Sequence, residues 1–262
     1  MILLAATAFT DLCAFAASPL PDPATVTQRL IEQSQGLAKS QSGPTYIFPK
    51  RTLIERLDSS GQVISSEERL FEVTLIGGIP VNRLLKVTGR DLTPDELQAE
   101  QERQERFQER ISSMDPKKLL ARKQGLVTTE LLDHYQYEVA ERIDFNGRPT
   151  LVVHFKPKDK PTANSSMRDR VLNRIAGTLW VDEQDWELAK VSARLTETIS
   201  MGWFGLLGSL SQCELALDRQ RMPDGVWVNT KQAWTIQFRK LASTTRFRVT
   251  ETSTNFRRVD QK

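Results

Sequence analysis

The chain is predicted to be mainly β, with a few helices and one curved antiparallel sheet. Between residues 177 and 259, long apolar–polar alternations are separated only by turn signals, which indicates strand, turn and strand in succession. Alternation with a period of two places one face against apolar material and the other against water. The stretches are long for strands, and long hairpin-connected strands build a one-sided sheet. Such a sheet must cover its apolar face with a helix, a partner or a ligand.

The first elements are expected to be a helix and a three-stranded meander. In residues 24–39, Val26, Leu30, Ile31 and Leu37 recur near helical spacing, and Thr25 or Thr27 can cap the helix. Three alternating stretches follow, and we expect strands there with turns at Ser-Ser-Gly and Gly-Gly between them. These strands are residues 45–57, 62–76 and 80–87.

The next segment interrupts the strand pattern. Thr93, Pro94 and Glu96 have the spacing of an N-terminal capping box with proline at the first helical position. The sequence up to residue 111 is rich in Glu, Gln and Arg and has almost no apolar face, which is typical of a solvated helix held by charge pairs. Shorter helical segments are expected at 117–123 and 126–133. We interpret residues 94–123 as a polar helical insertion within one domain.

Strands resume at residue 135. Residues 135–143 alternate, and Asn146-Gly147 is a strong signal for a tight hairpin turn. A polar loop at 156–164 comes after the return strand. Residues 167–175 can form either a short basic helix or an irregular approach to the next strand. The later turns are expected at residues 182–185, 201–208, 222–225 and near 242–243.

The N-terminus has the pattern of a secretory signal peptide. Residues 1–9 are apolar, Ala14-Phe15-Ala16 is a small-x-small cleavage pattern, and a proline-rich stretch begins at Ser18. We therefore expect residues 1–16 to be removed and the mature chain to be periplasmic. No basic residue precedes Ile2, which a wrongly assigned start codon would explain. The alternative is an apolar terminus of a cytosolic protein. No segment is apolar enough to span a bilayer.

Composition excludes two classes of protein. With 39% hydrophobic and 26% charged residues, the chain is not of the disordered type. Its formal net charge of +3 is too small and too dispersed to indicate a nucleic-acid partner. Of the two cysteines, Cys13 would leave with the signal peptide, and Cys213 lies in an alternating stretch where a small buried apolar residue is expected.

No catalytic constellation can be assembled from the sequence. The chain has two histidines, His134 and His154, and neither belongs to a motif. No cluster has the spacing of a metal site, and there is no phosphate loop or dinucleotide fingerprint. The paired acids Asp182 and Asp185 are explained by turn chemistry, because aspartate stabilises tight turns. We expect no enzyme, no cofactor and no metal.

Two groups of apolar residues are candidate contact sites. Large side chains at strand positions are candidates for the lining of a ligand cavity, although ordinary core packing would also explain them. These are Tyr137, Phe155, Trp180, Trp234, Phe238 and Phe247. The apolar tip at 201–208 either contacts a partner or a membrane interface, or folds back as a plug on the sheet. Its large residues are Trp203, Phe204, Leu206 and Leu207.

Several motifs, taken in order, resemble one family. Residues 177–182 read Gly-Thr-Leu-Trp-Val-Asp, and residues 185–191 read Asp-Trp-Glu-Leu-Ala-Lys-Val. Asn-Gly-Arg-Pro at 146–149, Pro-Asp-Gly-Val-Trp at 223–227 and Thr-Asn-Phe-Arg-Arg at 254–258 add to this pattern. Together they resemble the LolA/LolB-like outer-membrane lipoprotein-sorting superfamily, over residues 45–259.

The resemblance implies a strongly curved antiparallel sheet, an unclosed β-barrel, with helices covering its concave face. It implies a single half-barrel domain at 24–259 that carries lipid or lipoprotein acyl chains in an apolar cavity, without enzymatic chemistry. The chain is longer than the classical carriers and has an extra polar helix after Thr93, so the cargo could be another lipid or glycolipid. One alternative is a cell-envelope interaction or sensing module that reuses the fold. A hydrolase would instead need a polar cleft near Asp182 or Glu67.

Overall fold

The structure, a computed structural model, describes residues 18–39, 46–76, 79–115, 118, 127–159, 166–201, 208–240 and 243–259. The described helices are α1 (Pro23–Lys39), α2 (Pro94–Ser112), α4 (Thr129–Leu132) and α5 (Met167–Leu172). The strands are β1 (Tyr46–Leu57), β2 (Val63–Ile76), β3 (Ile79–Val87), β4 (Arg90–Asp91), β5 (Tyr135–Phe145), β6 (Arg148–Pro157), β7 (Ile175–Asp182), β8 (Glu187–Leu195), β9 (Ile199–Met201), β10 (Gly208–Arg221), β11 (Trp227–Lys240), β12 (Ser243–Ser253) and β13 (Arg257–Arg258).

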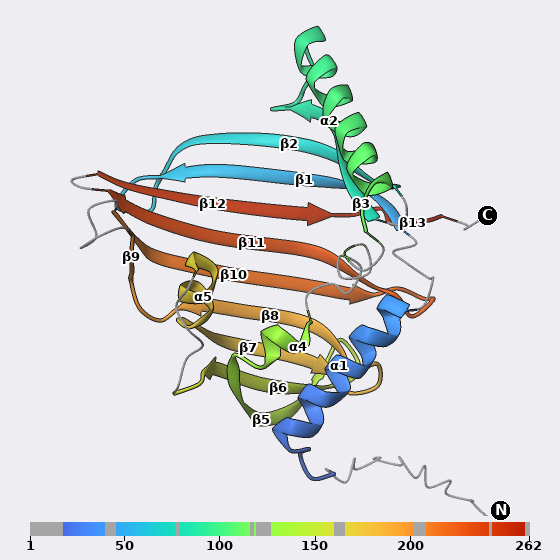
Figure 1. Ribbon diagram of the computed structural model, residues 1–262, viewed down its shortest axis with the longest axis vertical. Helices are drawn as coiled ribbons and strands as arrows, with labels where there is room; N and C mark the ends of the chain where they lie inside the picture. Colours follow the sequence, from blue (N-terminus) through green and yellow to red (C-terminus); the bar gives the residue numbers. More distant parts are fainter. Residues whose placement is uncertain are drawn as a thin grey trace, which may run out of the picture.

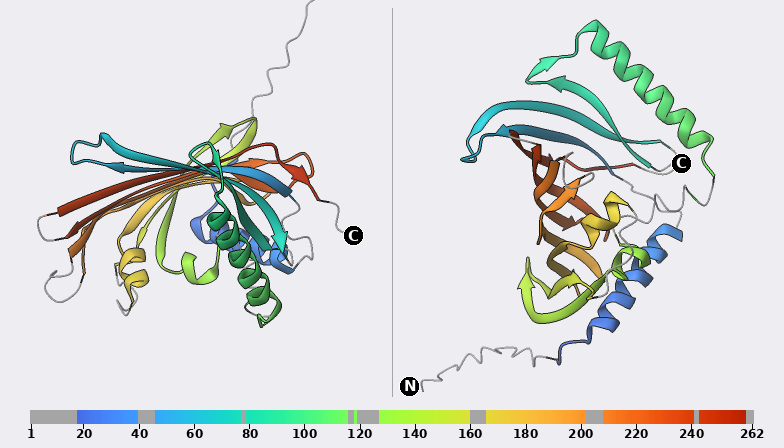
Figure 2. Two further views of the ribbon diagram at one scale, coloured as in Figure 1. Left: turned by 90° about the horizontal axis from the view of Figure 1, so that it is seen from above. Right: turned by 60° about the vertical axis from the view of Figure 1, so that its left-hand side comes forward.

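All of these strands form one antiparallel sheet. The order is β4-β3-β2-β1-β12-β11-β10-β8-β7-β6-β5, with β13 paired to β1 and β9 paired to β10 (Figure 1). The sheet does not close, because β4 and β5 lie at opposite ends of this order. Figure 2 shows the sheet bending around the side that carries the helices. The predicted fold class, a mainly β chain with a curved, unclosed antiparallel sheet and helices on its concave face, is confirmed.

Strand register assigns the side chains to two faces. Gln232, Trp234 and Ile236 of β11 lie directly opposite Glu251, Val249 and Phe247 of β12, so these six side chains share the concave face. Positions between them point to the convex face. There the side chains are largely charged or hydroxylated, as in the Lys190–Asp218 and Arg248–Glu55 ion pairs. The alternation in sequence therefore separates a polar convex face from a concave face that is mostly apolar.

The packed core lies under one half of the sheet. Val26 and Leu30 of α1 and Leu132 of α4 are buried against the concave side of β5, β6, β7, β8 and β10. At Gly177 a Cβ would stand 2.0 Å from the Ser192 carbonyl oxygen, so only glycine allows β7 and β8 to approach so closely with Phe155 alongside. The helices therefore cover the β5–β8 half closely and leave β10 to β12 less covered.

Helix α2 covers the edge of the sheet. Its N-terminus is the predicted capping box, in which the Glu96 amide donates to the Thr93 hydroxyl and Glu96 accepts from the Thr93 amide. Glu100, which is buried, accepts a hydrogen bond from the Leu84 amide of β3 at 3.1 Å. Gln104 donates to the Asn82 carbonyl at 2.9 Å. The predicted solvated helix thus uses polar side chains to satisfy an exposed strand edge.

Replacing Glu100 by Ala should open this edge. The change leaves the Leu84 amide without its acceptor, a local loss of about 1–3 kcal/mol. We expect faster hydrogen exchange at Leu84 and a concentration-dependent shift to larger species in gel filtration, because an uncovered strand edge pairs with other strands. Glu102→Ala is the matched control, since the Glu102 side chain on the same helix is 50% exposed. Unchanged exchange at Leu84 in Glu100→Ala would contradict the edge role of α2.

Other sequence predictions have clear outcomes. The Asn146-Gly147 hairpin is confirmed, with positive φ angles of 56° and 77° at the two turn residues. The segment at 167–175 contains both a short helix and an irregular approach to the next strand, because α5 ends at Leu172 and β7 begins at Ile175. The helix predicted at 126–133 corresponds to α4, which is shorter and spans Thr129–Leu132. The signal peptide at 1–16 and most of the predicted helix at 117–123 lie outside the described residues. In the described part, no helix is long and apolar enough to cross a membrane.

Candidate functional site

The concave face of β10, β11 and β12 carries a row of large apolar side chains that we call the trough. Three of them remain substantially exposed, namely Leu215 at 39%, Phe238 at 39% and Phe247 at 38%. Cross-strand pairing joins them into one surface, which also includes Cys213, Trp234, Ile236, Val249 and Ile54. A contiguous apolar surface of this kind on the inside of a curved sheet is a binding site for apolar groups.

A cavity of about 840 Å³ lies farther along the same face, between α1 and the sheet. We call it the α1 cavity. Leu30 and Leu37 of α1 form one wall, and Tyr46 and Phe48 of β1 lie across from them. Trp227 of the β10–β11 hairpin end also lines it. Because Tyr46 and Phe48 share a face with Ile54, the α1 cavity and the trough are two ends of one concave surface.

The predicted cavity residues divide among three places. Trp234, Phe238 and Phe247 lie together in the trough. Tyr137 and Phe155 face the same side of the sheet but belong to the packed core near α4. Trp180 alternates with the core residue Leu179 and lies on the convex face, where the Lys190 ammonium is 5.3 Å from its ring centroid. None of the six is among the residues that line the α1 cavity.

Tyr135 and Tyr137 belong to the core beneath α4, where Tyr135 is buried and Tyr137 is partly buried. Burial raises the pKa of the Tyr135 hydroxyl to about 12, and it also raises the pKa of Tyr137, together with the charges of Tyr135 and Asp133. The Tyr137 hydroxyl donates to the Leu132 carbonyl at 3.1 Å, which fixes the ring against α4. This end of the concave surface is therefore filled by the chain itself.

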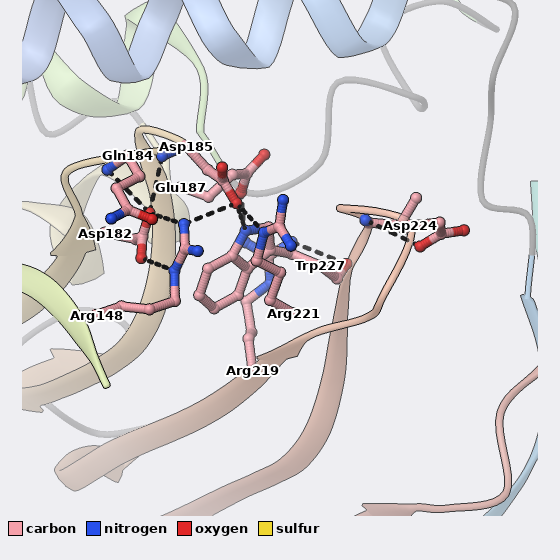
Figure 3. A network of polar contacts seen from close by, with 10 residues as sticks. Arg148, Asp182, Gln184, Asp185, Glu187, Arg219, Arg221, Asp224 and Trp227 are labelled. Carbon is pink, nitrogen blue, oxygen red and sulfur yellow. Dashed lines mark hydrogen bonds and ion pairs between the residues drawn. The ribbon is translucent and has the colours of Figure 1, made fainter. Parts of the chain in front are cut away.

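A network of ion pairs borders the α1 cavity (Figure 3). Asp182 is fully buried and accepts from Arg148 at 2.8 Å and from the amides of Gln184 and Asp185 at 3.1 and 2.8 Å. Asp185 in turn accepts from Trp227 Nε1 at 2.9 Å. The turn role expected for this acidic pair is thus visible in the hydrogen bonds of Asp182, and its charge is matched by Arg148.

The other carboxylates of the network are also paired. Burial acts to raise the pKa of Asp185, but hydrogen bonds from Trp227 and Arg221 and the charge of Arg148 outweigh it and hold the pKa below its usual range. Glu187 pairs with Arg219 at 2.6 Å. A carboxylate held ionised by its partners is poorly suited to act as a general acid. The network therefore stabilises the strand ends that border the cavity.

The structure does not bring the two candidate acid pairs together. Glu67 and Glu68 lie on β2, and five strands separate β2 from β7, which carries Asp182. His134 is buried with Nδ1 2.7 Å from the Glu130 carbonyl, whereas His154 is exposed beside Thr178. Among the residues that the structure describes, no group of His, Cys, Asp and Glu could hold a metal ion.

Sequence reasoning missed the α1 cavity and the charged pair near it. Lys50 of β1 and Glu251 of β12 occupy inward positions, with 3.0 Å between Nζ and Oε1. The available signal in the sequence was that Lys50 and Glu251 each occupy a position that alternation assigns to the apolar face. Only the strand register shows that these two side chains meet. The predicted contact residues Trp203, Phe204, Leu206 and Leu207 lie outside the described residues.

No protein-family model and no curated protein matches the chain. Among solved structures, it is similar to an outer membrane lipoprotein-sorting protein domain from Vibrio parahaemolyticus, with 12% identity, a TM-score of 0.36 and coverage of 88% of this chain and 93% of that one. A LolA superfamily protein from Nitrosomonas europaea has 9% identity and a TM-score of 0.29, with coverage of 90% and 94%. A MucA/MucB complex from Pseudomonas aeruginosa has 10% identity and a TM-score of 0.25, with coverage of 90% and 100%. At such scores these matches carry no argument about function.

Proposed function

We propose that this chain is a non-enzymatic periplasmic carrier that binds the acyl chains of a lipid or lipoprotein on the concave side of its sheet. The observation that supports this most is the trough, where Leu215, Phe238 and Phe247 remain 38–39% exposed on the apolar face. These three side chains lie on the face that elsewhere forms the core, and apolar side chains left exposed together favour an apolar ligand. The trough therefore holds the cargo in this proposal.

The energetics of acyl binding need no specific polar group. Each buried methylene contributes about 0.8 kcal/mol, so covering about ten of them contributes about 8 kcal/mol before the cost of association. That cost lowers the net affinity, and a carrier must also release its cargo. From Trp234 to Phe238 the trough floor extends along β11 for about 13 Å at the usual rise per residue. This is enough surface for a chain of that length.

The proposed location follows from the N-terminal pattern. An apolar segment with a small-x-small motif at residues 14–16 directs export, after which the carrier would work between the membranes. Lipid, lipoprotein and glycolipid cargoes share the hydrocarbon that the trough would contact. The cargo within this class is identified by what the purified protein carries.

A second candidate is a cell-envelope interaction or sensing module, in which the trough binds an apolar protein segment instead of a lipid. The observation in its favour is that the trough opens to solvent. The apolar residues Trp203, Phe204, Leu206 and Leu207 are its proposed partner or membrane contacts. Under this reading, Trp203→Ser/Phe204→Ser abolishes partner or membrane association, whereas the carrier proposal leaves acyl binding in place.

Native mass spectrometry and lipid extraction test the carrier proposal. The full chain is expressed with export into a bacterial periplasm, purified without detergent, and analysed before and after organic extraction. We expect adducts with the masses of acyl lipids that disappear on extraction. We also expect saturable binding of a fluorescent fatty-acyl probe to the extracted protein. The absence of both lipid adducts and saturable probe binding would contradict the carrier proposal.

A further inference from the structure

Four polar side chains cross the apolar concave face between the trough and the α1 cavity. We call Lys50, Thr52, Gln232 and Glu251 the polar belt. Thr52 lies opposite Glu251 across the β1–β12 pair, and Gln232 lies opposite Glu251 across the β11–β12 pair, so the belt is continuous. Lys50 also faces inward, since it lines the α1 cavity together with Gln232 and Glu251.

Apolar side chains lie on both sides of the polar belt, although Ser253 of β12 and the ion-paired Asp185 and Glu187 also line the α1 cavity. Toward the α1 cavity, the next inward residues of β1 are Phe48 and Tyr46. Toward the trough, the next inward residues are Trp234 on β11, Val249 on β12 and Ile54 on β1. A ligand that lies along β1 would therefore meet the apolar side chain of Phe48, then the polar belt, then the apolar side chain of Ile54.

The belt is electrically neutral and mostly removed from water. Lys50 and Glu251 are only 12% and 16% exposed, and their charges cancel across 3.0 Å. The Thr52 hydroxyl also donates to Glu251 at 3.3 Å, and the Lys50 ammonium is 5.4 Å from the Phe71 ring centroid. Keeping a charged pair in such surroundings costs desolvation free energy, and hydrophobic residues of similar volume would often stabilise the sheet as well.

Hydrogen-bonding capacity remains at the belt. The side-chain amide of Gln232 is half-buried and has no hydrogen-bond partner among the described residues. The Lys50 ammonium has three N–H donors, of which the Glu251 carboxylate takes one. A half-buried amide without a partner loses free energy unless a ligand or water satisfies it. The belt therefore offers N–H donors to an acceptor that enters from the cavity.

The charges restrict which acceptor fits. A carboxylate placed against Gln232 would come close to Glu251, the cross-strand neighbour of Gln232, and would be repelled. A cation would meet Lys50. A neutral carbonyl accepts from both donors and brings no net charge into a poorly solvated site.

We propose that the polar belt recognises the neutral ester or amide carbonyl that links acyl chains to the rest of a lipid, with hydrocarbon lying in the trough beyond it. This inference rests on the proposed carrier function and narrows its cargo to acyl esters and amides, in preference to free fatty acids. The belt thereby sets the position of the ligand along the strands, since hydrocarbon alone would slide along an apolar surface.

Competition against a fluorescent fatty-acyl probe tests the inference in the full chain. The competitors are methyl laurate and laurate, which differ in the charge of the head group. The wild-type protein should bind methyl laurate about tenfold more tightly, because one net hydrogen bond and the absence of repulsion favour the ester. In Gln232→Leu the ester should lose most of this preference while laurate affinity changes little. Lys50→Met/Glu251→Met, which removes both charges together, should also bring the two affinities together.

Matched variants separate the possible outcomes. Lys231→Met alters the neighbouring residue on the convex face and should keep the tenfold preference for the ester. Thermal unfolding of every variant establishes that the fold is intact, and the charge-pair variant is interpreted only beside Gln232→Leu, which leaves Lys50 and Glu251 in place. Equal affinity of ester and acid for the wild-type protein would overturn the inference but not the carrier function. An unchanged preference for the ester in Gln232→Leu would do the same. Failure of both compounds to compete with a probe that binds would also overturn it. If the probe itself does not bind, the carrier function fails, and the inference fails with it.

Discussion

Asp182→Ala should lower the free energy of unfolding by about 3–5 kcal/mol, because it leaves two partly buried turn amides without their acceptor and removes the fully buried partner of Arg148, which keeps its ion pair with Asp185 at 3.2 Å. Asp182 is fully buried and also accepts the amides of Gln184 and Asp185, so the turn between β7 and β8 loses its acceptor. Urea unfolding should show a large decrease in the midpoint with little change in the slope. A decrease of less than 1 kcal/mol would show that the network does not stabilise the strand ends.

Two comparisons sharpen the Asp182 result. Asp218→Ala removes a carboxylate that is 41% exposed and 3.5 Å from Lys190, so its effect should stay within about 1 kcal/mol. Arg148→Met combined with Asp182→Ala should cost less than the sum of the two single changes, because each single change already removes the same Arg148–Asp182 hydrogen bonds. Additive losses would mean that the Arg148–Asp182 hydrogen bonds of 2.5 and 2.8 Å contribute little coupling.

Phe238→Asp/Phe247→Asp should weaken acyl binding at least about a hundredfold. The change removes two large apolar contacts, each worth about 1.5–3 kcal/mol when covered, and places two charges where hydrocarbon must lie. Both rings are already 38–39% exposed, so the fold should tolerate the change better than a substitution in the core. Titration with a fluorescent fatty-acyl probe measures the loss.

The control places the same two charges on the other side of the same strands. Thr235→Asp/Thr252→Asp adds carboxylates to the convex face of β11 and β12, where Thr235 lies opposite Arg248. Probe affinity should change less than about threefold there, as expected for surface substitutions away from a site. Equal losses of probe affinity in the two double variants would show that the trough is not the binding surface. They would indicate a general effect of added charge.

Much of the fold could be predicted because alternation in this chain is long and its turns carry strong local signals. Asn146-Gly147 and the capping box at Thr93 act through a few neighbouring atoms, so local sequence is sufficient to place them. Edge coverage by α2 was not predictable, since it depends on which strand happens to be last in the sheet order. Glu100 looked like one more solvated acid in a polar helix.

The site was predictable only in part, for a related reason. Apolar positions on one face of a strand can be read from sequence, and Trp234, Phe238 and Phe247 do share the concave face. What covers each of them depends on where the helices lie, and this separates the buried Phe155 from the exposed Phe238. Trp180 was a cavity candidate because of its size, but it alternates with the core residue Leu179 and lies on the convex face beside Lys190. The Lys50–Glu251 pair joins residues 201 positions apart, which no local pattern can reveal.

The pairing of β1 with β12 has a consequence for how the molecule folds. β1 joins the meander of β1 to β3 to the rest of the sheet through β12, which is nearly the last strand to be synthesised. Until residue 253 has emerged, that meander has no neighbour on its inner side, and closure requires a loop of about two hundred residues. Maturation should thus be slow and late, with a half-assembled intermediate that is prone to aggregate.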